Sequence, residues 1–292
     1  MSDFFQLLVA GLATGAIYAL IAIGFTLLWQ TSQTINFAQG EFVMLPAFFV
    51  LTGMGYFKLP FWIAVVAAFV VSILLLGVLF KKLMVDPMIR HGVLPLVIAT
   101  IALALLMKEG VREFYSAEAQ GFPSLAAATN VSILGVAFAV QSLVVLIVTA
   151  VAVGVLQLFL NKTRTGRRMQ ATAQNPTVAR LLGIPVERMI LYTFLINAAL
   201  VALASVLVTP IYLAKFSNGE WLGMYAFIAA IVGGFNQVRG ALVGGLLLGV
   251  VDNFAAAYLS AQYRLAMPLL ILIVVILFRP QGLLGRLEER TV

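Results

Sequence analysis

Nine runs of mostly apolar residues divide this sequence, and no other feature constrains its fold as strongly. Several of them can cross a bilayer as a helix, since a hydrocarbon core about 30 Å thick needs roughly 20 apolar residues. Of the 292 residues, 63% are hydrophobic and only 10% are charged, whereas about a quarter of a soluble domain is charged. The sequence therefore predicts an all-α, polytopic helical membrane protein with about eight or nine transmembrane segments. The runs cover residues 4–29, 36–57, 61–80, 93–107, 133–160, 189–213, 222–237, 240–257 and 265–278.

The composition also excludes several kinds of site. There is no cysteine, so neither disulfides nor thiolate chemistry can occur, and the single histidine, His91, excludes a multi-histidine metal centre. We expect no catalytic residue, no metal and no cofactor. The net charge of +7 indicates a charge bias between membrane loops rather than a nucleic-acid partner.

The distribution of Lys and Arg predicts the orientation. If the N-terminus is outside and all nine runs cross, the outer side holds only Lys58, Lys108, Arg112, Lys215 and Arg264. The remaining Lys and Arg residues then lie inside, as the positive-inside rule requires. This places the polar loop 161–188 and the C-terminus in the cytoplasm. Eight crossings with one re-entrant segment is the alternative.

The pair 222–237 and 240–257 is short and closely spaced. Two interpretations remain open: a tight helical hairpin, or broken helices inside the bundle, where non-helical backbone is tolerated at membrane depth. Glycines spaced four apart predict close helix packing, either within the chain or between subunits. These pairs are Gly11 and Gly15, Gly240 and Gly244, and Gly245 and Gly249.

The loop 161–188 contains a helix signal. Asn175 followed by Pro176 suits a helix start, and Gly183 suits a C-terminal cap, so we expect a short helix over about 176–182. Its apolar side would be Val178, Leu181 and Leu182. The helix either docks a cytoplasmic partner or belongs to a solvated basic loop that only enforces topology.

Three blocks of the sequence resemble the LivH-type permease subunits of bacterial branched-chain amino acid ABC transporters. The blocks are GLATGAIYALIAIGFTLLW followed by INFAQGEF, the loop TGRRMQATAQNPTVARLLGIPVERM, and AAIVGGFNQVRGALVGGLLLGVVDN followed by LFRPQGLLG. The resemblance spans nearly the whole chain, so residues 1–292 are expected to form one transmembrane permease domain. It is less specific for the solute, because permeases for urea, short-chain amides and other small carboxylates look similar.

The resemblance implies an ATP-driven importer in the bacterial inner membrane. Two cytoplasmic ATPases would drive it, an external binding protein would deliver the solute, and a second permease, a LivM-like paralogue or a second copy, would complete the pathway. The loop resembles the segment that couples to the ATPase, although ATAQNP stands where the general signature opens Glu-Ala-Ala. The coupling residues would be Gly166, Ala171, Ala173, Val178, Ala179, Arg180, Leu181, Leu182 and Gly183.

Polar residues inside the apolar runs are the candidates for the pathway or its gate, because such residues are expensive in lipid. The candidates are Asn36, Gln39, Glu41, Asn197, Asp252 and Asn253. Structural roles compete with these. In the structural interpretation, Glu41 opens a helix near the cytoplasmic interface and Asn197 bonds a neighbouring helix.

The sequence argues against two other classes of protein. A self-sufficient carrier or channel would need ion-coupling residues and no docking helix, and a membrane enzyme would need a nucleophile or metal cluster. No G-x-x-x-x-G-K-[ST] phosphate-binding loop occurs in the chain, so ATP hydrolysis by that route has to reside in another polypeptide.

Overall fold

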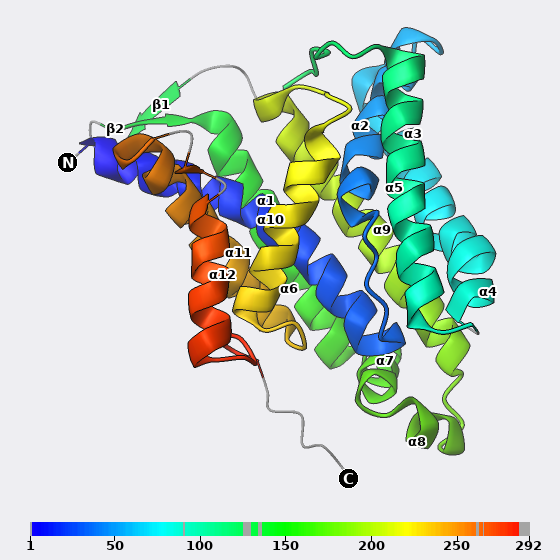
Figure 1. Cartoon of the computed structure of the whole chain (residues 1–292). Coiled ribbons are helices and arrows are strands. Elements are labelled where there is room, and N and C mark those ends of the chain that lie inside the picture. The colour runs from blue at the N-terminus through cyan, green and yellow to red at the C-terminus, as the bar shows by residue number, and fades with distance from the viewer. Residues whose placement is uncertain are drawn as a thin grey trace. The chain divides into compact units, whose positions relative to one another are not determined.

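The computed structural model describes residues 2–89, 91–124, 130–133, 136–260, 263–264 and 266–285, and within these it is almost entirely helical (Figure 1). The longer helices are α1 (Ser2–Ser32), α2 (Gln39–Gly55), α3 (Phe61–Ser72), α5 (Val93–Tyr115), α6 (Val140–Lys162), α9 (Val186–Tyr212), α10 (Asn218–Gly233), α11 (Val238–Tyr258) and α12 (Ala266–Phe278). The α3 helix continues through the π-helical turns η1 (Ile73–Leu79) and η2 (Lys81–Val85) into α4 (Asp86–Ile89). Two further short helices, α7 (Arg164–Gln174) and α8 (Pro176–Leu181), precede α9.

Each of the nine apolar runs corresponds to a helix, and six of these are long and apolar enough to cross a membrane. The chain is therefore an all-α, multi-pass membrane protein. The helices α2, α10 and α12 are shorter, with 17, 16 and 13 residues. The predicted start of the run 133–160 was wrong. Antiparallel strands β1 (Asn130–Ile133) and β2 (Val136–Ala139) come first, and the helix begins only at Val140.

Contacts divide the chain into two compact units. Unit 1 comprises Met1–Thr26, Leu125–Ala150 and Met224–Val292, and unit 2 comprises Leu27–Ser124 and Val151–Gly223. In unit 2, α2 packs against α3, α5 and α9, and the π-helical turns of η1 also pack against α9 (Figure 1). Aromatic rings pack in this interior. The ring centroid of Phe80 lies 4.9 Å from that of Phe42 and 6.0 Å from that of Phe194.

In unit 1, glycines bring α1 and α11 into backbone contact. A Cβ added at Gly11 would lie 2.8 Å from the Cα of Val250, and one at Gly15 would lie 2.7 Å from the carbonyl oxygen of Gly245. Gly249 in turn faces the backbone of Gly15. The close packing expected from the glycine spacing is thus confirmed, and it lies within the chain.

The helices α10 and α11 form a tight hairpin, which is one of the two arrangements left open by the sequence. A Cβ at Gly240 would clash with the carbonyl of Gly233, and one at Gly244 would clash with that of Ala229. The turn between the helices uses Gly234, whose φ of 117° suits glycine.

Breaks in the helical backbone occur elsewhere, before α2 and before α10. Residues 33–38 connect α1 to α2 without helical structure, and Thr34, Asn36 and Ala38 in this linker are buried. Residues 213–217 connect α9 to α10 in the same way, with Ala214 buried. Non-helical backbone at membrane depth is tolerated where protein surrounds it, so both short helices begin inside unit 2.

Candidate functional site

A polar cluster lies where α2 begins in unit 2. The side-chain amides of Gln39 and Asn197 bond reciprocally, with nitrogen–oxygen distances of 2.6 and 3.0 Å. The Asn36 amide nitrogen approaches the Gln39 oxygen at 3.5 Å, and the Asn36 oxygen accepts the N–H of Ala38 at 3.0 Å. All three predicted candidates thus come together in a buried network, and Asn197 has the helix-bonding role that competed with solute contact.

Glu41 lies two residues further along α2, where α2 and α10 cross at glycines. Its helix begins at Gln39, and no side chain caps the N-terminus. A Cβ at Gly219, in the first turn of α10, would collide with the Glu41 carboxylate, and one at Gly40 would collide with the Gly219 carbonyl. The side chain is only 4% exposed, and its Oε2 has no hydrogen-bond partner in the described part of the chain. Glu41 therefore lies in the first turn of a helix, one of its two competing interpretations, and that turn is buried within protein.

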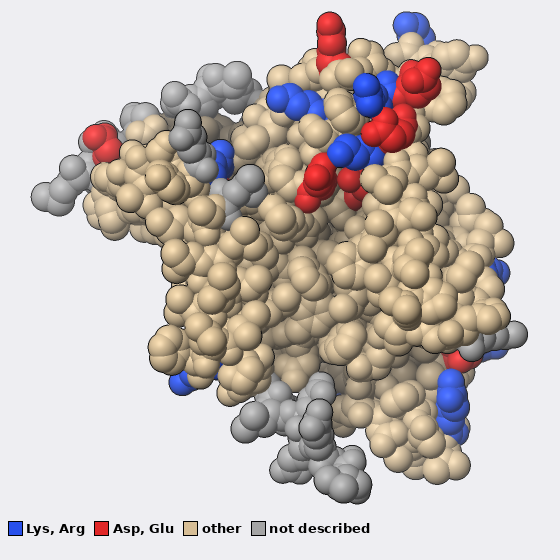
Figure 2. Space-filling view, viewed as in Figure 1, with Lys and Arg blue, Asp and Glu red and all other residues tan. Residues whose placement is uncertain are grey.

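An ion pair flanks this crossing. The Nζ of Lys108 on α5 lies 2.6 Å from the Oε2 of Glu220, the residue after Gly219. Glu109, the neighbour of Lys108 in the sequence, bonds Arg112 at 3.1 Å instead. Figure 2 shows acidic and basic side chains gathered near the C-terminal end of α5, beside a broad surface without charge.

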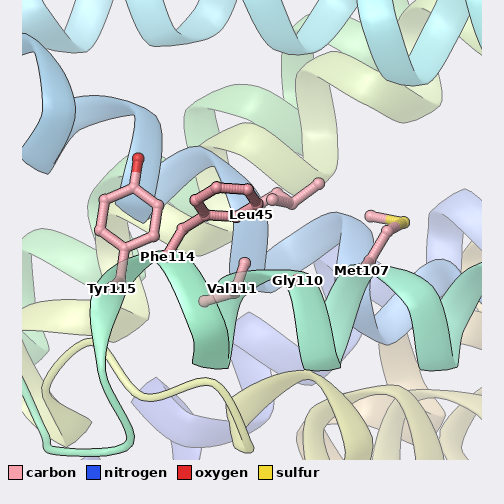
Figure 3. Close-up of a pocket in the computed structure, with 6 residues that line it drawn as sticks. All are labelled: Leu45, Met107, Gly110, Val111, Phe114 and Tyr115. Carbon is pink, nitrogen blue, oxygen red and sulfur yellow. The ribbon is translucent and has the colours of Figure 1, made fainter.

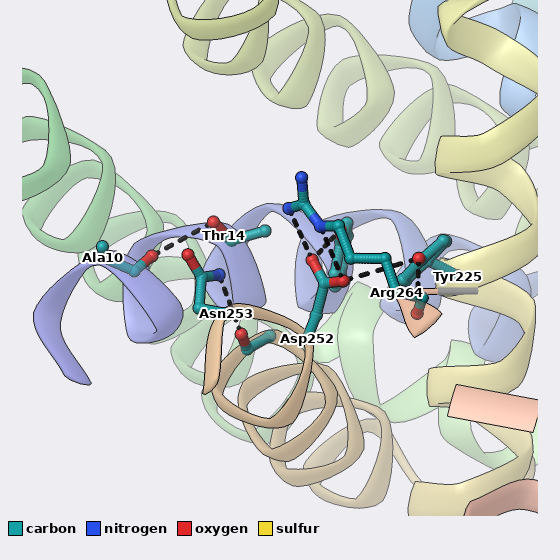
Figure 4. Close-up of polar contacts among 8 residues, drawn as sticks. Ala10, Thr14, Tyr225, Asp252, Asn253 and Arg264 are labelled. Carbon is teal, nitrogen blue, oxygen red and sulfur yellow. Dashed lines mark hydrogen bonds and ion pairs between the residues drawn. The ribbon is translucent and has the colours of Figure 1, made fainter. Parts of the chain in front are cut away.

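Asp252 belongs to a separate cluster in unit 1 (Figure 4). Arg264 donates two hydrogen bonds to its carboxylate, from Nε at 3.0 Å and from a terminal nitrogen at 2.8 Å. The hydroxyls of Tyr18 and Tyr225 donate to the same carboxylate at 3.3 and 3.5 Å. Asp252 is fully buried, and this set of donors explains its presence inside the membrane as a structural ion pair.

Asn253, the neighbour of Asp252, has a local role. Its side-chain amide donates to the carbonyl of Gly249, four residues earlier, at 3.0 Å. The structure thus brings Asn36, Gln39, Glu41 and Asn197 into one unit and leaves Asp252 and Asn253 in the other.

The polar loop between α6 and α9 forms two helices. The sequence missed α7, which Thr163 caps by accepting the N–H of Gly166 at 2.9 Å. The predicted short helix is present as α8. The Asn175 oxygen accepts the N–H of Val178 at 3.0 Å, and Pro176 occupies the first turn. At the other end Gly183, with φ 77°, allows the N–H of Ile184 to bond the Ala179 carbonyl, which is a Schellman cap.

The apolar face of α8 is exposed in this chain. The exposed fractions are 47% for Val178, 82% for Leu181 and 74% for Leu182. Arg180 extends beside them and pairs with Glu187 at 3.1 Å. Of the other expected coupling residues, Ala179 and Gly166 are buried, so these two can only support the segment, while Ala171 and Ala173 are half-buried.

An apolar groove of about 520 Å³ lies between α2 and α5 (Figure 3). Its lining is Leu45, Met107, Gly110, Val111, Phe114 and Tyr115. The hydroxyl of Tyr115 is its polar member, and it bonds the hydroxyl of Thr52. Sequence reasoning missed this groove because its residues look like ordinary lipid-facing positions.

Sequence reasoning also missed the partners of the buried acids. Arg264 was assigned to an outer loop, and its proximity along the chain to Asp252 was the available signal. For Glu220 the available signal was its sequence context. It stands in an Asn-Gly-Glu sequence that resembles Gln39-Gly40-Glu41. No group of three or more acidic or histidine side chains that could hold a metal ion occurs among the described residues.

Comparison with known proteins identifies the family. The model for branched-chain amino acid transport system / permease component matches residues 7–276. The permease protein BraD of Pseudomonas aeruginosa, named as part of a high-affinity branched-chain amino acid transport system, is 34% identical over 303 aligned positions, which cover 99% of this chain and 98% of that one. LivH of Escherichia coli, named in the same way, is 32% identical over 301 positions with the same coverage.

A more distant relative extends the similarity beyond bacteria. A probable branched-chain amino acid transport permease LivH of Methanocaldococcus jannaschii is 28% identical over 283 positions, covering 91% of this chain and 88% of that one. No solved structure matches the chain significantly. Because the family model and the full-length relatives agree, the chain belongs to the family of permease components of branched-chain amino acid transport systems.

Proposed function

We propose that this chain is the permease subunit of an ATP-driven importer of branched-chain amino acids, and that it forms half of the translocation pathway. The names of its relatives, high-affinity branched-chain amino acid permeases, suggest the solute. Residues 1–292 would act as one permease domain. Energy would come from two cytoplasmic ATPases, because the chain has no phosphate-binding loop of its own.

The exposed face of α8 is the observation that carries the proposal. Leu181 and Leu182 are large aliphatic side chains with most of their surface uncovered, on a helix held at both ends by caps. A rigid apolar surface that protrudes beside exposed arginines is complementary to an apolar pocket with an acidic rim on a soluble partner. The residues Val178, Arg180, Leu181 and Leu182 would contact the ATPase. The residues Gly166, Ala171, Ala173, Ala179 and Gly183 would shape the segment that carries them.

Nine crossings follow from this assignment. With the N-terminus outside and α7–α8 in the cytoplasm, each linker together with α2 or α10 makes one broken crossing, and α12 makes the last. The C-terminus would then be cytoplasmic, and the protein would lie in the bacterial inner membrane. A second permease, a LivM-like paralogue or a second copy, would supply the other half of the pathway, and an external binding protein would deliver the solute.

The test is coupling in the assembled transporter. The permease, its partner permease and the ATPases are reconstituted in proteoliposomes, and ATP hydrolysis and leucine uptake are measured with and without loaded binding protein. We expect Leu182→Asp to abolish the stimulation of ATP hydrolysis by loaded binding protein, because it places a charge on the exposed apolar face. The side chain is mostly exposed, so folding and insertion should be unchanged.

Thr177→Asp is the matched control. It places the same charge in the first turn of α8, where a carboxylate is compatible with the helix dipole, and it should leave coupling intact. A Leu182→Asp transporter with normal stimulation and uptake would reject the docking role of α8. Wild-type transporter that accumulates leucine without ATPases would reject the importer itself.

A further inference from the structure

Two segments of the chain repeat each other. Residues 37–48 read FAQGEFVMLPAF and residues 216–227 read FSNGEWLGMYAF. The shared positions are Phe37 and Phe216, Gly40 and Gly219, Glu41 and Glu220, Ala47 and Ala226, and Phe48 and Phe227. In both cases the segment begins a short helix that follows a long one.

The backbone repeats as well. Gln33, the first residue after α1, has a φ of 53°, and Leu213, the first residue after α9, has a φ of 64°. Each linker then closes with one turn of the same type. The N–H of Gln39 bonds the Asn36 carbonyl at 3.2 Å, and the N–H of Asn218 bonds the Lys215 carbonyl at 3.1 Å. Agreement in sequence and in the closing turn indicates an internal repeat. The residue of positive φ begins each linker, although the first linker is one residue longer than the second.

The two copies run in opposite directions along α5. The first linker contacts the N-terminal half of α5, where the N–H of Phe37 lies 3.3 Å from the Thr100 hydroxyl. The second linker pairs with the chain just beyond the C-terminal end of α5, through backbone hydrogen bonds of 2.9 Å between Ala214 and Gln120. The two helix N-termini therefore approach each other from opposite sides and cross at their glycines.

This arrangement is the one from which many transporters build solute sites. Short or interrupted helices in corresponding halves of an inverted repeat present their N-termini to the solute. In this chain, however, the crossing is shut. A Cβ at Gly223 would lie 2.8 Å from the Cα of Gly40, and one at Gly219 would collide with the Glu41 carboxylate.

The repeat-related glutamates differ in their partners. Glu220 has a cation at hydrogen-bond distance, the ammonium of Lys108. Lys108 also attracts Glu41 electrostatically, but its hydrogen bond goes to Glu220. Glu41 keeps a buried Oε2 without a hydrogen-bond partner among the described residues. An unpaired buried acceptor is unfavourable, so the Oε2 of Glu41 lacks one hydrogen-bond donor.

The apolar groove begins one turn from this acid. Leu45 follows Glu41 by four residues and so shares its face of α2, and Met107 and Val111 flank Lys108 along α5. A carboxylate beside an aliphatic groove matches an ammonium group beside an aliphatic side chain.

We propose that the crossing of α2 and α10 is a solute subsite, seen here in its closed form. Glu41 binds the ammonium group of the amino acid, and the groove at Leu45, Met107 and Val111 receives its aliphatic side chain. The inference rests on the proposed function, since it names how that pathway recognises its solute. The solute ammonium can reach Glu41 only after Gly219 and Gly223 separate from α2. Binding therefore favours the open form alone and shifts the equilibrium toward it.

The experiment uses the absence of cysteine in the wild-type chain. Leu45→Cys is introduced, the complete transporter is reconstituted in phosphatidylethanolamine–phosphatidylglycerol vesicles, and the alkylation rate of Cys at this position is followed with N-ethylmaleimide. Three probes share one aliphatic tail: leucine, isopentylamine, which lacks the carboxylate, and 4-methylpentanoate, which lacks the ammonium. We expect leucine and isopentylamine to slow alkylation, and 4-methylpentanoate to have a much weaker effect.

Glu41→Gln keeps the size of the side chain and removes its charge. It should abolish protection by both amines and lower leucine uptake by about ten-fold or more, as expected for the loss of one charge-assisted hydrogen bond. Glu109→Gln is the control, because Glu109 lies on the exposed side of α5 and pairs only with Arg112 among the ion pairs of the described residues. If Glu41→Gln does not assemble, Glu41→Asp gives the second variant, for which protection should be weakened but present.

Equal protection in Leu45→Cys transporters with and without Glu41→Gln would overturn the proposal, and so would leucine uptake that Glu41→Gln leaves unchanged. Absence of protection by leucine in a Leu45→Cys transporter that takes up leucine would equally overturn it. These failures differ from failure of the proposed function, which would appear as a wild-type transporter without ATP-dependent leucine uptake.

Discussion

The side-chain amides of Gln39 and Asn197 exchange two hydrogen bonds across 158 positions of sequence, at 2.6 and 3.0 Å. Both residues are completely buried. The pair joins the first turn of α2 to the middle of α9, next to the linker 33–38 that precedes α2. It therefore holds the start of α2 in place and satisfies two amides that would otherwise be costly inside a bilayer.

Asn197→Ala should destabilise the protein by about 1–3 kcal/mol, because Gln39 would stay buried without its partner. Unfolding in detergent, followed by temperature or denaturant, measures this. A double-mutant cycle with Gln39→Ala should give a coupling free energy of about 0.5–2 kcal/mol. Asn253→Ala is the control, since Asn253 bonds only a carbonyl of its own helix. Strictly additive effects of the two substitutions would show that the pair has no energetic role.

Asp252→Asn should destabilise unit 1, because Arg264 would lose the charge that accepts its two hydrogen bonds. The loss should reach about 1.5–3 kcal/mol, as for hydrogen bonds to charged groups. Glu187→Gln removes the exposed partner of Arg180 and should change stability by less than about 1 kcal/mol. Thermal unfolding of the two variants in parallel gives the comparison. Similar shifts for both would contradict a structural role for the buried pair.

Gly249→Ala should separate α1 from α11. Its new Cβ would meet the backbone of Gly15, which cannot yield as a flexible side chain can. We expect a loss of about 1–3 kcal/mol, typical of overpacking. Gly154→Ala is matched in chemistry, but its Cβ would have no atom within 4 Å, so it should be neutral or slightly stabilising. Thermal unfolding distinguishes them, and equal stability of the two variants would refute the proposed contact.

Gly183→Ala should weaken coupling without unfolding the protein. The φ of 77° at this residue is unfavourable for alanine, so the last turn of α8 should fray and its Schellman hydrogen bonds should open. Hydrogen exchange of the Ile184 amide should become faster, and stimulation of ATP hydrolysis by loaded binding protein should fall. Gly183→Asn should retain more of both properties, because asparagine tolerates left-handed backbone. Identical exchange rates in Gly183→Ala and wild type would show that the substitution leaves the Schellman cap closed, which contradicts this prediction.

The helices could be predicted well because they are determined by residues that are close together in the sequence. Each apolar run is read from composition alone, and the caps of α8 depend on residues within a few positions of each other. The α7 helix was missed because its basic, hydrophilic sequence carries no apolar run. The β1–β2 hairpin was missed because its apolar residues were absorbed into the neighbouring run.

The partners of the intramembrane polar residues could not be predicted in the same way. Gln39 meets Asn197, and Glu41 meets Gly219, only because α2, α9 and α10 pack together, and this depends on contacts across most of the chain. Asp252 lies twelve residues before Arg264, but a charge assigned to a loop gives no indication that it folds back. Polar residues in the apolar runs could thus be recognised as important from the sequence, whereas their hydrogen-bond partners required the structure.

The left-handed residues that begin the two linkers have a mechanical consequence. Leu213 has φ 64° and ψ 163°, a region almost restricted to glycine that stores about 1–3 kcal/mol of strain in other residues. Gln33, the first residue of the other linker, also has positive φ, at 53°. We expect a rotation at Leu213 to relieve its backbone strain, which makes the junction between α9 and its linker the predicted hinge for α10.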